Sequence, residues 1–100
     1  MEKRRPTYDV EAFKASVAAD KAGFTRTAVR SARMLGFGYQ DMKAAIAIMG
    51  RRHFIKSMTS YADHRLWQDV YHVPYEGLVL YVKFSAGTVT EFTVLSFKER

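Results

Sequence analysis

The stretch FIKSMTSYADHRLWQDVY, residues 54–71, indicates a pair of β-strands and decides how the rest of the chain is interpreted. Residues 54–61 are rich in aromatic, β-branched and hydroxyl side chains, and residues 66–73 alternate in a similar way, with turn-forming residues between them. Lys56 and Gln68 each lie on one of these strands among apolar neighbours. A polar side chain on a half-buried strand is costly unless it has a purpose, so this pair predicts a functional surface.

Three segments before this stretch have apolar residues at helical spacing. The first helix is expected from about residue 10 to residue 19, with Asp9 as its N-cap. A second helix is expected to begin after Thr25 or Thr27 and to end at Gly36, which stands where a C-terminal glycine belongs. The third is expected over residues 40–49, with Gly50 as its stop.

The chain after residue 73 is expected to contain two more strands. Residues 74–77 predict a turn, residues 78–85 a strand with Tyr81 and Lys83 on its outward face, and residues 88–98 the last strand. Three helices followed by about four antiparallel strands predict an α+β fold. The helices should cover one face of the sheet and leave the other open.

Length and composition predict one domain over residues 1–100, folded around a core that needs no disulfides. Cysteine is absent, which excludes thiol catalysis and disulfides. No apolar run reaches the roughly 20 residues that a membrane span needs. The basic N-terminus has no apolar segment after it, so we expect no signal peptide, no membrane association and a cytoplasmic protein.

Positive charge is concentrated in the first half of the chain. Residues 1–56 hold twelve Lys/Arg and five Asp/Glu, whereas residues 57–100 hold four and five. A basic domain of this kind most often binds nucleic acid or an acidic protein. Arg26, Arg30 and Arg33 share one helical face, which suits phosphate recognition. The alternative is that this face is simply the solvated side of an amphipathic helix.

The candidate chemistry is that of a ribonuclease without a metal. The chain has no glycine-rich phosphate loop, no histidines at zinc-ligand spacing and no G-x-S-x-G nucleophile motif. Lys56 could stabilise a phosphorane, Gln68 could position a phosphate or base, and Tyr81 could donate a proton, with His64 or His72 titrating near neutrality. The alternative is that Lys56 and Tyr81 are ordinary surface residues of a strand.

Four segments of the sequence together resemble the MqsR (motility quorum-sensing regulator) toxin family. They are MEKR at residues 1–4, the stretch 54–71, VLYVK at residues 79–83 and SFKER at residues 96–100. The resemblance runs over nearly the whole chain and implies a RelE-like fold. It also implies a toxin of a type II toxin–antitoxin system, which cuts messenger RNA at GC-containing sites without a metal, a cofactor or the ribosome. Such cleavage inhibits translation and arrests growth.

The resemblance also implies a partner and a set of site residues. The expected partner is an MqsA-like antitoxin, with a zinc-binding N-terminal domain and a helix-turn-helix domain through which alone the pair would bind operon DNA. The predicted catalytic residues are Lys56, Gln68 and Tyr81, with 2′-hydroxyl attack giving a 2′,3′-cyclic phosphate. The predicted RNA-binding residues, from the resemblance and the basic pattern together, are Met58, His72, Lys83, Lys98, Arg26 and Arg30.

Two positions in this set depart from the family's pattern. Ile55 stands where the family has a tyrosine, and His72 stands where it has an arginine. The chain therefore lacks a hydroxyl and a permanent positive charge beside the predicted site. Two other functions remain open on the sequence alone, namely a binding module that holds RNA without cutting it and a protein-interaction subunit.

Overall fold

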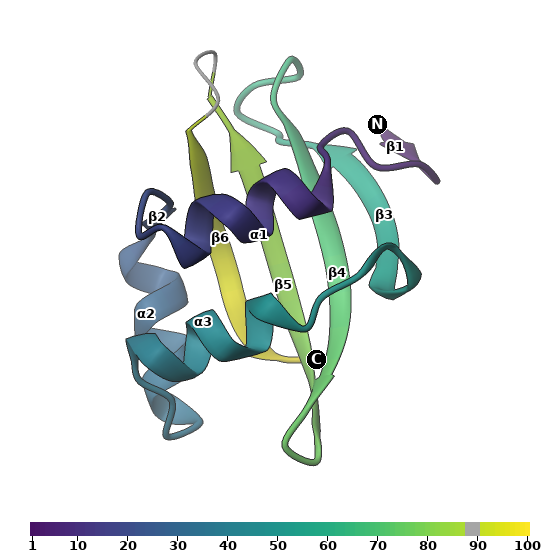
Figure 1. The fold of residues 1–100 in the computed structure, drawn as a ribbon. Coiled ribbons are helices and arrows are strands. Elements are labelled where there is room, and N and C mark those ends of the chain that lie inside the picture. The colour runs from purple at the N-terminus through teal and green to yellow at the C-terminus, as the bar shows by residue number, and fades with distance from the viewer. Residues whose placement is uncertain (88–90) are drawn as a thin grey trace.

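Three helices and a six-stranded sheet make up the chain in a computed structural model, which describes residues 1–87 and 91–100 (Figure 1). The elements in chain order are β1 Glu2–Lys3, α1 Val10–Ala18, β2 Gly23–Phe24, α2 Arg26–Met34, α3 Tyr39–Ala47, the 3-10 turn η1 Arg51–His53, β3 Phe54–Thr59, β4 Trp67–Tyr75, β5 Leu78–Ala86 and β6 Phe92–Glu99. None of the described helices is long and apolar enough to cross a membrane.

The sheet has the order β1-β3-β4-β5-β6-β2. Helices α1 and α3 cross one face of it, and α2 packs against β6 at one edge (Figure 1). The predicted α+β class is confirmed, but the prediction of about four antiparallel strands is wrong. Strand β1 adds an antiparallel pair at one edge, and β2 pairs with β6 in parallel at the other. Each of these strands has only two residues, which is too short to show an alternating pattern.

The helix ends follow the capping chemistry of the sequence, with one exception. The Asp9 carboxylate accepts hydrogen bonds in the first turn of α1, and the Thr25 hydroxyl does the same for α2. Gly36 follows α2 with a φ of 84°, the left-handed conformation that glycine adopts most easily. Helix α3 already ends at Ala47, so the expectation that Gly50 stops it is wrong. Gly50 has a φ of −142° and begins η1 instead.

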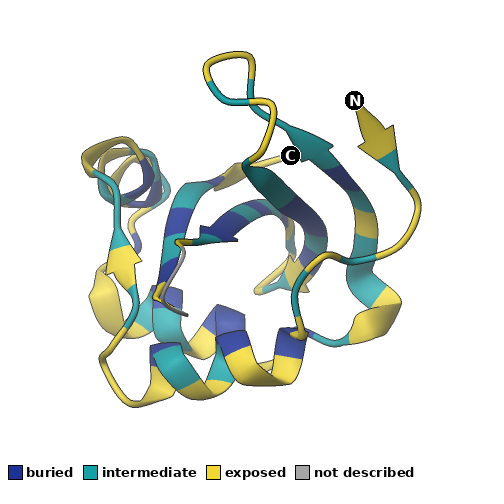
Figure 2. Ribbon diagram, turned by 90° about the horizontal axis from the view of Figure 1, so that it is seen from above, coloured by how far each residue is buried: buried dark blue, intermediate teal, exposed yellow. Residues whose placement is uncertain are grey.

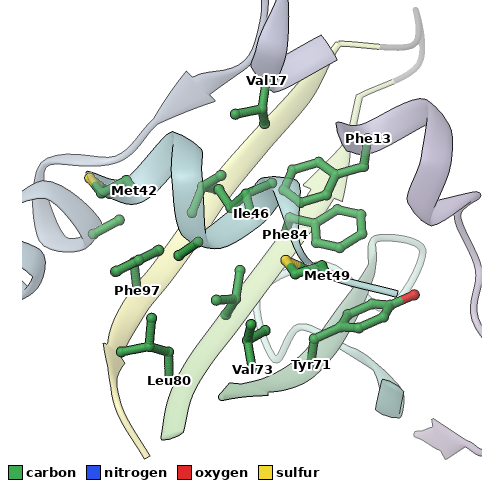
Figure 3. Packing of buried hydrophobic residues seen from close by; sticks show 14 of the residues in the cluster. Phe13, Val17, Met42, Ile46, Met49, Tyr71, Val73, Leu80, Phe84 and Phe97 are labelled. Atoms are coloured by element: carbon green, nitrogen blue, oxygen red, sulfur yellow. The ribbon is translucent and has the colours of Figure 1, made fainter. Parts of the chain in front are cut away.

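The core lies between the helices and the inner face of the sheet, which curves around the helix layer (Figures 2 and 3). Phe84 is at its centre and is fully buried. The ring of Phe13 from α1 stacks on it at 3.7 Å, and the ring of Tyr71 lies 5.8 Å away. Burial raises the pKa of Tyr71 to about 12. This cluster holds α1 to the sheet and so fixes the layer opposite the open face.

The N-terminal arm is attached to the sheet by the buried carboxylate of Asp69. This side chain is fully buried and accepts hydrogen bonds from the backbone N–H groups of Thr7, at 3.1 and 3.0 Å, and of Tyr8, at 2.9 Å. The Thr7 and Ser57 hydroxyl oxygens lie 2.8 Å apart. A buried carboxylate with several N–H donors is well compensated, so the arm has a defined path that leads β1 along the edge of β3.

The hairpins differ in detail from the sequence expectation. Strand β4 continues through Tyr75, so the predicted turn over 74–77 shrinks to Glu76 and Gly77, whose φ values are 51° and 79°. Positive φ at both central residues is the type I′ geometry that suits a tight hairpin. The first three residues of the predicted last strand, 88–90, lie outside the described residues, and β6 begins at Phe92.

Alternation along β4 predicts that Trp67 lies on the face opposite Gln68 and packs under the helices, but its surroundings are different. Its backbone pairs with Thr59 of β3. Its side chain lies on the opposite face of the sheet from that of Gln68, as the alternation predicts. However, Trp67 is only half-buried and lies outside the helix-side core. The ammonium group of Lys3 lies 4.1 Å from the centre of its ring. The N-terminal arm, rather than a helix, therefore covers Trp67.

Candidate functional site on the open face of the sheet

A β-bulge in β3 turns Lys56 toward the open face. Phe54 pairs with Tyr71 on the core side, but Lys56 pairs with Val70, so Ile55 is an extra residue between the two pairs. In a regular strand, residues two apart point to the same face, and Lys56 would then point into the core with Phe54. The bulge shifts the alternation by one residue, which places the Lys56 side chain opposite the helices.

A second irregularity does the same for Lys98 on β6. Phe84 pairs with Val94 and Lys83 with Ser96, so Leu95 is the extra residue here. Val94 and Phe97 can therefore both lie in the core although they are three residues apart. Ser96 and Lys98 then share the open face with their partners on β5. Simple alternation from Val94 would have placed Lys98 on the core side.

The predicted site residues on the sheet surround Val70, and we call them the open-face cluster. Val70 is fully buried yet belongs to the sheet face opposite the helix-side core. Lys56 and Lys83 lie directly across from it on β3 and β5, and Gln68 and His72 flank it along β4. Directly paired residues have Cβ atoms about 4.5–5.5 Å apart. The cluster comprises Lys56, Met58, Gln68, His72, Tyr81, Lys83 and Lys98.

Tyr81 lies between two nitrogen-bearing side chains in the next row of the sheet. It pairs with His72 on one side and with Lys98 on the other. The His72 and Tyr81 ring centres are 5.8 Å apart, and the Lys98 ammonium lies 5.2 Å from the Tyr81 ring centre. Tyr81 is therefore close to Lys56 only diagonally, across β4. A ligand that contacts both has to lie over Val70.

Lys83 is a half-buried cation without a carboxylate partner among residues 1–87 and 91–100. Burial lowers the pKa of its ammonium group below the ordinary lysine value, and the positive charge of Lys98 lowers this pKa further. A bound anion would reverse both effects by supplying the missing counter-charge. An anion is therefore a more favourable neighbour for Lys83 than another cation.

Lys56 has a partner that the sequence analysis missed. Its ammonium nitrogen lies 3.1 Å from a carboxylate oxygen of Glu2. Glu2 pairs with Met58 in the β1–β3 ladder, so its side chain points to the same open face. No sequence signal identifies Glu2, because the pairing of a two-residue strand depends on the fold of the whole N-terminal arm.

Arg26 and Arg30 do not lie beside Lys56. Both are exposed on α2, at the β6 edge of the sheet, and β4, β5 and β6 separate that helix from Lys56 (Figure 1). His64 lies in the loop after β3, beyond Met58, and is not a neighbour of Tyr81. Among the described residues, no three His, Asp or Glu side chains form a group that could hold a metal ion.

Comparison with known proteins places this arrangement in a family. The sequence pattern of the family described as "Motility quorum-sensing regulator, toxin of MqsA" matches residues 5–99. This chain belongs to the MqsR family. It is 35% identical over 100 residues to the mRNA interferase toxin MqsR of Escherichia coli (strain K12), and the match covers the full length of both chains.

His72 is a titratable member of the open-face cluster, so it makes the positive charge of this site depend on pH. Burial and the nearby Arg100 both lower the pKa of the His72 imidazole below 6.5. A lowered pKa means that His72 is neutral at pH 7.5 and takes up a proton only below its ordinary titration range. We therefore expect single-stranded RNA to bind more tightly as the pH falls from 6.5 to 5.

Replacing His72→Arg should supply this positive charge at every pH. We expect the slope of log K against log salt concentration to steepen by about 0.7, the value for one added phosphate contact on a single strand. The control is Ile48→Arg, which adds the same charge on the helix layer, where Ile48 is 47% exposed. Equal salt slopes for the two variants would contradict a phosphate contact at position 72.

Proposed function

We propose that this chain is the toxin of a type II toxin–antitoxin pair and cleaves messenger RNA as an endoribonuclease. The observation that carries the proposal is the open-face cluster, in which two lysines flank Val70 and a tyrosine and a glutamine lie beside them. The matched relative, named an mRNA interferase toxin, supports the same activity. A RelE-like arrangement, with the RNA on the uncovered face of the sheet, is part of the proposal.

The proposed reaction uses side chains of the cluster together with solvent water. A scissile phosphate lies over Val70, between the ammonium groups of Lys56 and Lys83, which stabilise the charge of the phosphorane. The ribose 2′-hydroxyl oxygen attacks phosphorus and gives its proton to a solvent water molecule, and the bond from phosphorus to the 5′-oxygen breaks. Tyr81 donates a proton to that 5′-oxygen, and the Gln68 amide positions the phosphate. The products are a 2′,3′-cyclic phosphate and a 5′-hydroxyl.

Glu2 has a positioning role in this proposal. The ion pair at 3.1 Å holds the flexible lysine stem of Lys56 over the open face, although its negative charge also repels RNA. We expect Glu2→Gln to slow cleavage about two- to fivefold, because an exposed ion pair contributes at most about 1 kcal/mol. The same variant should bind RNA more tightly, since a repulsive charge is removed.

Single-turnover cleavage and filter binding measure these two effects separately. The matched control is Glu11→Gln, which removes a carboxylate from an ion pair with Lys14 at 3.4 Å on α1. That variant should cleave and bind as the wild type does. If Glu2→Gln changed neither the cleavage rate nor the affinity for RNA, Glu2 would have no positioning role.

The proposed partner is an MqsA-like antitoxin, and the proposed compartment is the cytoplasm. The family's description as a toxin of MqsA supports this partner. The expected antitoxin has a zinc-binding N-terminal domain and a helix-turn-helix domain that contacts operon DNA. Expression of the chain alone should arrest growth, and co-expression of such an antitoxin should restore it.

Cleavage of purified RNA separates this proposal from its alternative. End-labelled single-stranded RNA with GC-containing sites is incubated with the protein in excess EDTA. Defined fragments support a metal-independent nuclease that needs no ribosome. A mobility shift with intact RNA would favour a module that binds RNA without cutting it, and the enzymatic proposal would then be wrong.

A further inference from the structure

A pocket of about 210 Å³ opens where β1 meets the end of β3, and we call it the edge pocket. Glu2, Met58, Tyr61 and His64 are among the residues that line it. It is smaller than the roughly 300–1,000 Å³ that is typical for drug-sized ligands, so it suits a single planar ring system. Its walls combine an aromatic ring, an imidazole, a thioether and a carboxylate.

Tyr61 has no role in folding that would explain its position. Its side chain is fully exposed, at 102%, so it contributes no burial to the stability of the domain. Single exposed apolar side chains are common on protein surfaces, so the position of Tyr61 at the edge pocket, and not its exposure alone, carries the argument. In single-strand nucleic-acid binding proteins, exposed aromatic rings serve as platforms on which bases stack.

The loop that carries Tyr61 is held in a defined shape by its own hydrogen bonds. The Ala62 N–H donates to the Ser60 hydroxyl oxygen at 3.1 Å, and the Arg65 N–H donates to the Asp63 carboxylate at 2.9 Å. The Ser60 N–H donates to the Leu66 carbonyl at 3.3 Å and closes the loop. The Tyr61 ring is therefore presented from an ordered backbone at the rim of the pocket.

The edge pocket is continuous with the open-face cluster. Glu2 lines the pocket and also pairs with Lys56, and Met58 is the next residue after Lys56 on the open face of β3. Two residues along a strand span about 6.6–6.8 Å, a distance that one nucleotide can bridge. The Lys56 ammonium offsets part of the negative charge of Glu2, which reduces the repulsion of a strand that passes Lys56 at the pocket.

We propose that the edge pocket is a nucleobase subsite, which takes the base of a nucleotide adjacent to the phosphate at Lys56 and stacks it against Tyr61. This inference rests on the proposed function, because it assumes that single-stranded RNA lies on the open face. It adds a base-binding site in which Met58 is the one lining residue from the predicted set. It also assigns to the β3–β4 loop the task of fixing the position of the strand over the cluster.

The test uses an RNA that cannot be cut, so that binding is measured without cleavage. Each strand of a series carries 2′-O-methyl groups throughout and one fluorescent 2-aminopurine, moved by one position at a time. With the wild type, we expect the fluorescence to fall strongly at one position. Tyr61→Phe should behave in the same way, because it keeps the ring. Tyr61→Ala should lose this response and bind at least about fivefold more weakly.

Ile48→Ala is the control, since it truncates an exposed apolar side chain on the helix layer. Thermal unfolding should match the wild type for both alanine variants, because neither side chain is buried. An unchanged affinity and fluorescence pattern in Tyr61→Ala would overturn the subsite. So would a Tyr61→Ala defect in antitoxin binding with normal RNA binding, because the pocket would then serve a protein partner.

Cleavage of unmodified RNA by the wild type tells the two proposals apart. If the wild type cuts RNA and Tyr61→Ala binds as well as the wild type, the subsite alone is wrong. If the wild type does not cut RNA, the nuclease proposal is wrong. The 2-aminopurine fluorescence of the 2′-O-methyl strands still shows whether the edge pocket binds a base.

Discussion

Lys56→Ala should lower the single-turnover rate of RNA cleavage by at least about 10²–10³-fold, the usual cost of removing one group that stabilises transition-state charge. In the proposed site the Lys56 ammonium lies across from Val70, with Lys83 on the other side. Lys83 cannot take the place of Lys56, because its ammonium group approaches the phosphate from β5, on the other side of Val70. The loss should appear in the rate at saturating RNA more than in affinity.

The fold of the Lys56→Ala variant should remain intact. The side chain of Lys56 is 33% exposed and its only ion pair in the described part of the chain is with Glu2, so its loss should cost at most about 1 kcal/mol. Lys14→Ala is the matched control, since it removes an ion-paired lysine from α1. Lys56→Arg should recover part of the rate by restoring the charge. A Lys56→Ala protein that cleaves RNA as fast as the wild type would remove Lys56 from the site.

Phe84→Ala should lower the free energy of unfolding by about 3–5 kcal/mol. Phe84 is fully buried, and its ring lies within 6.0 Å, centre to centre, of Tyr8, Phe13, Tyr71 and Phe92. Truncation therefore leaves a cavity between α1 and the sheet. For a domain of this size, we expect the melting temperature to fall by about 15–30 °C.

Chemical denaturation measures the Phe84→Ala effect directly. Ile48→Ala, which removes an exposed apolar side chain from the end of α3, should change the free energy of unfolding by no more than about 0.5 kcal/mol. A loss below about 1 kcal/mol in Phe84→Ala would mean that the helix layer does not depend on this cluster. The packing described for the core would then be wrong.

The sequence predicts those parts of the fold that have local signals. Asp9 and Thr25 cap the first two helices as expected, and Gly36 ends α2, because capping depends on groups within one turn of each other. Gly50 is the exception, because α3 ends at Ala47, three residues before it. Strands β1 and β2 were missed because two residues are too few to show an alternating hydrophobic pattern. Each is a strand only because it pairs with a strand that is distant in the sequence.

The candidate site depends on two bulges that no alternation pattern reveals. Lys56 and Lys98 reach the open face only because Ile55 and Leu95 are extra residues in β3 and β6. Lys56 was identified as a polar residue on an apolar strand, and Lys98 by resemblance to the family. Strict alternation from Phe54 and Val94 would have placed both on the core side. Glu2 was missed because its contact with Lys56 joins residues 54 positions apart. Long-range pairing of this kind is a property of the fold rather than of any local segment.

The structure also shows where Ile55, the first departure from the family's pattern, lies. Ile55 is the bulged residue itself and is 38% exposed. A bulge depends mainly on the backbone, so an isoleucine can keep Lys56 aimed at the open face although the tyrosine hydroxyl is absent. The departure expected at His72 is different, because a histidine in place of an arginine would remove a permanent positive charge from the row that holds Tyr81.

The chemical nature of the RNA ends tests the central claim most directly. Purified protein is incubated with a single-stranded RNA in excess EDTA, beside Lys56→Ala and Lys14→Ala, and the fragments are weighed by mass spectrometry. The proposed site predicts 2′,3′-cyclic phosphates and 5′-hydroxyls from the wild type and Lys14→Ala, and intact RNA from Lys56→Ala. Intact RNA with the wild type, or fragments with 5′-phosphates, would contradict the account.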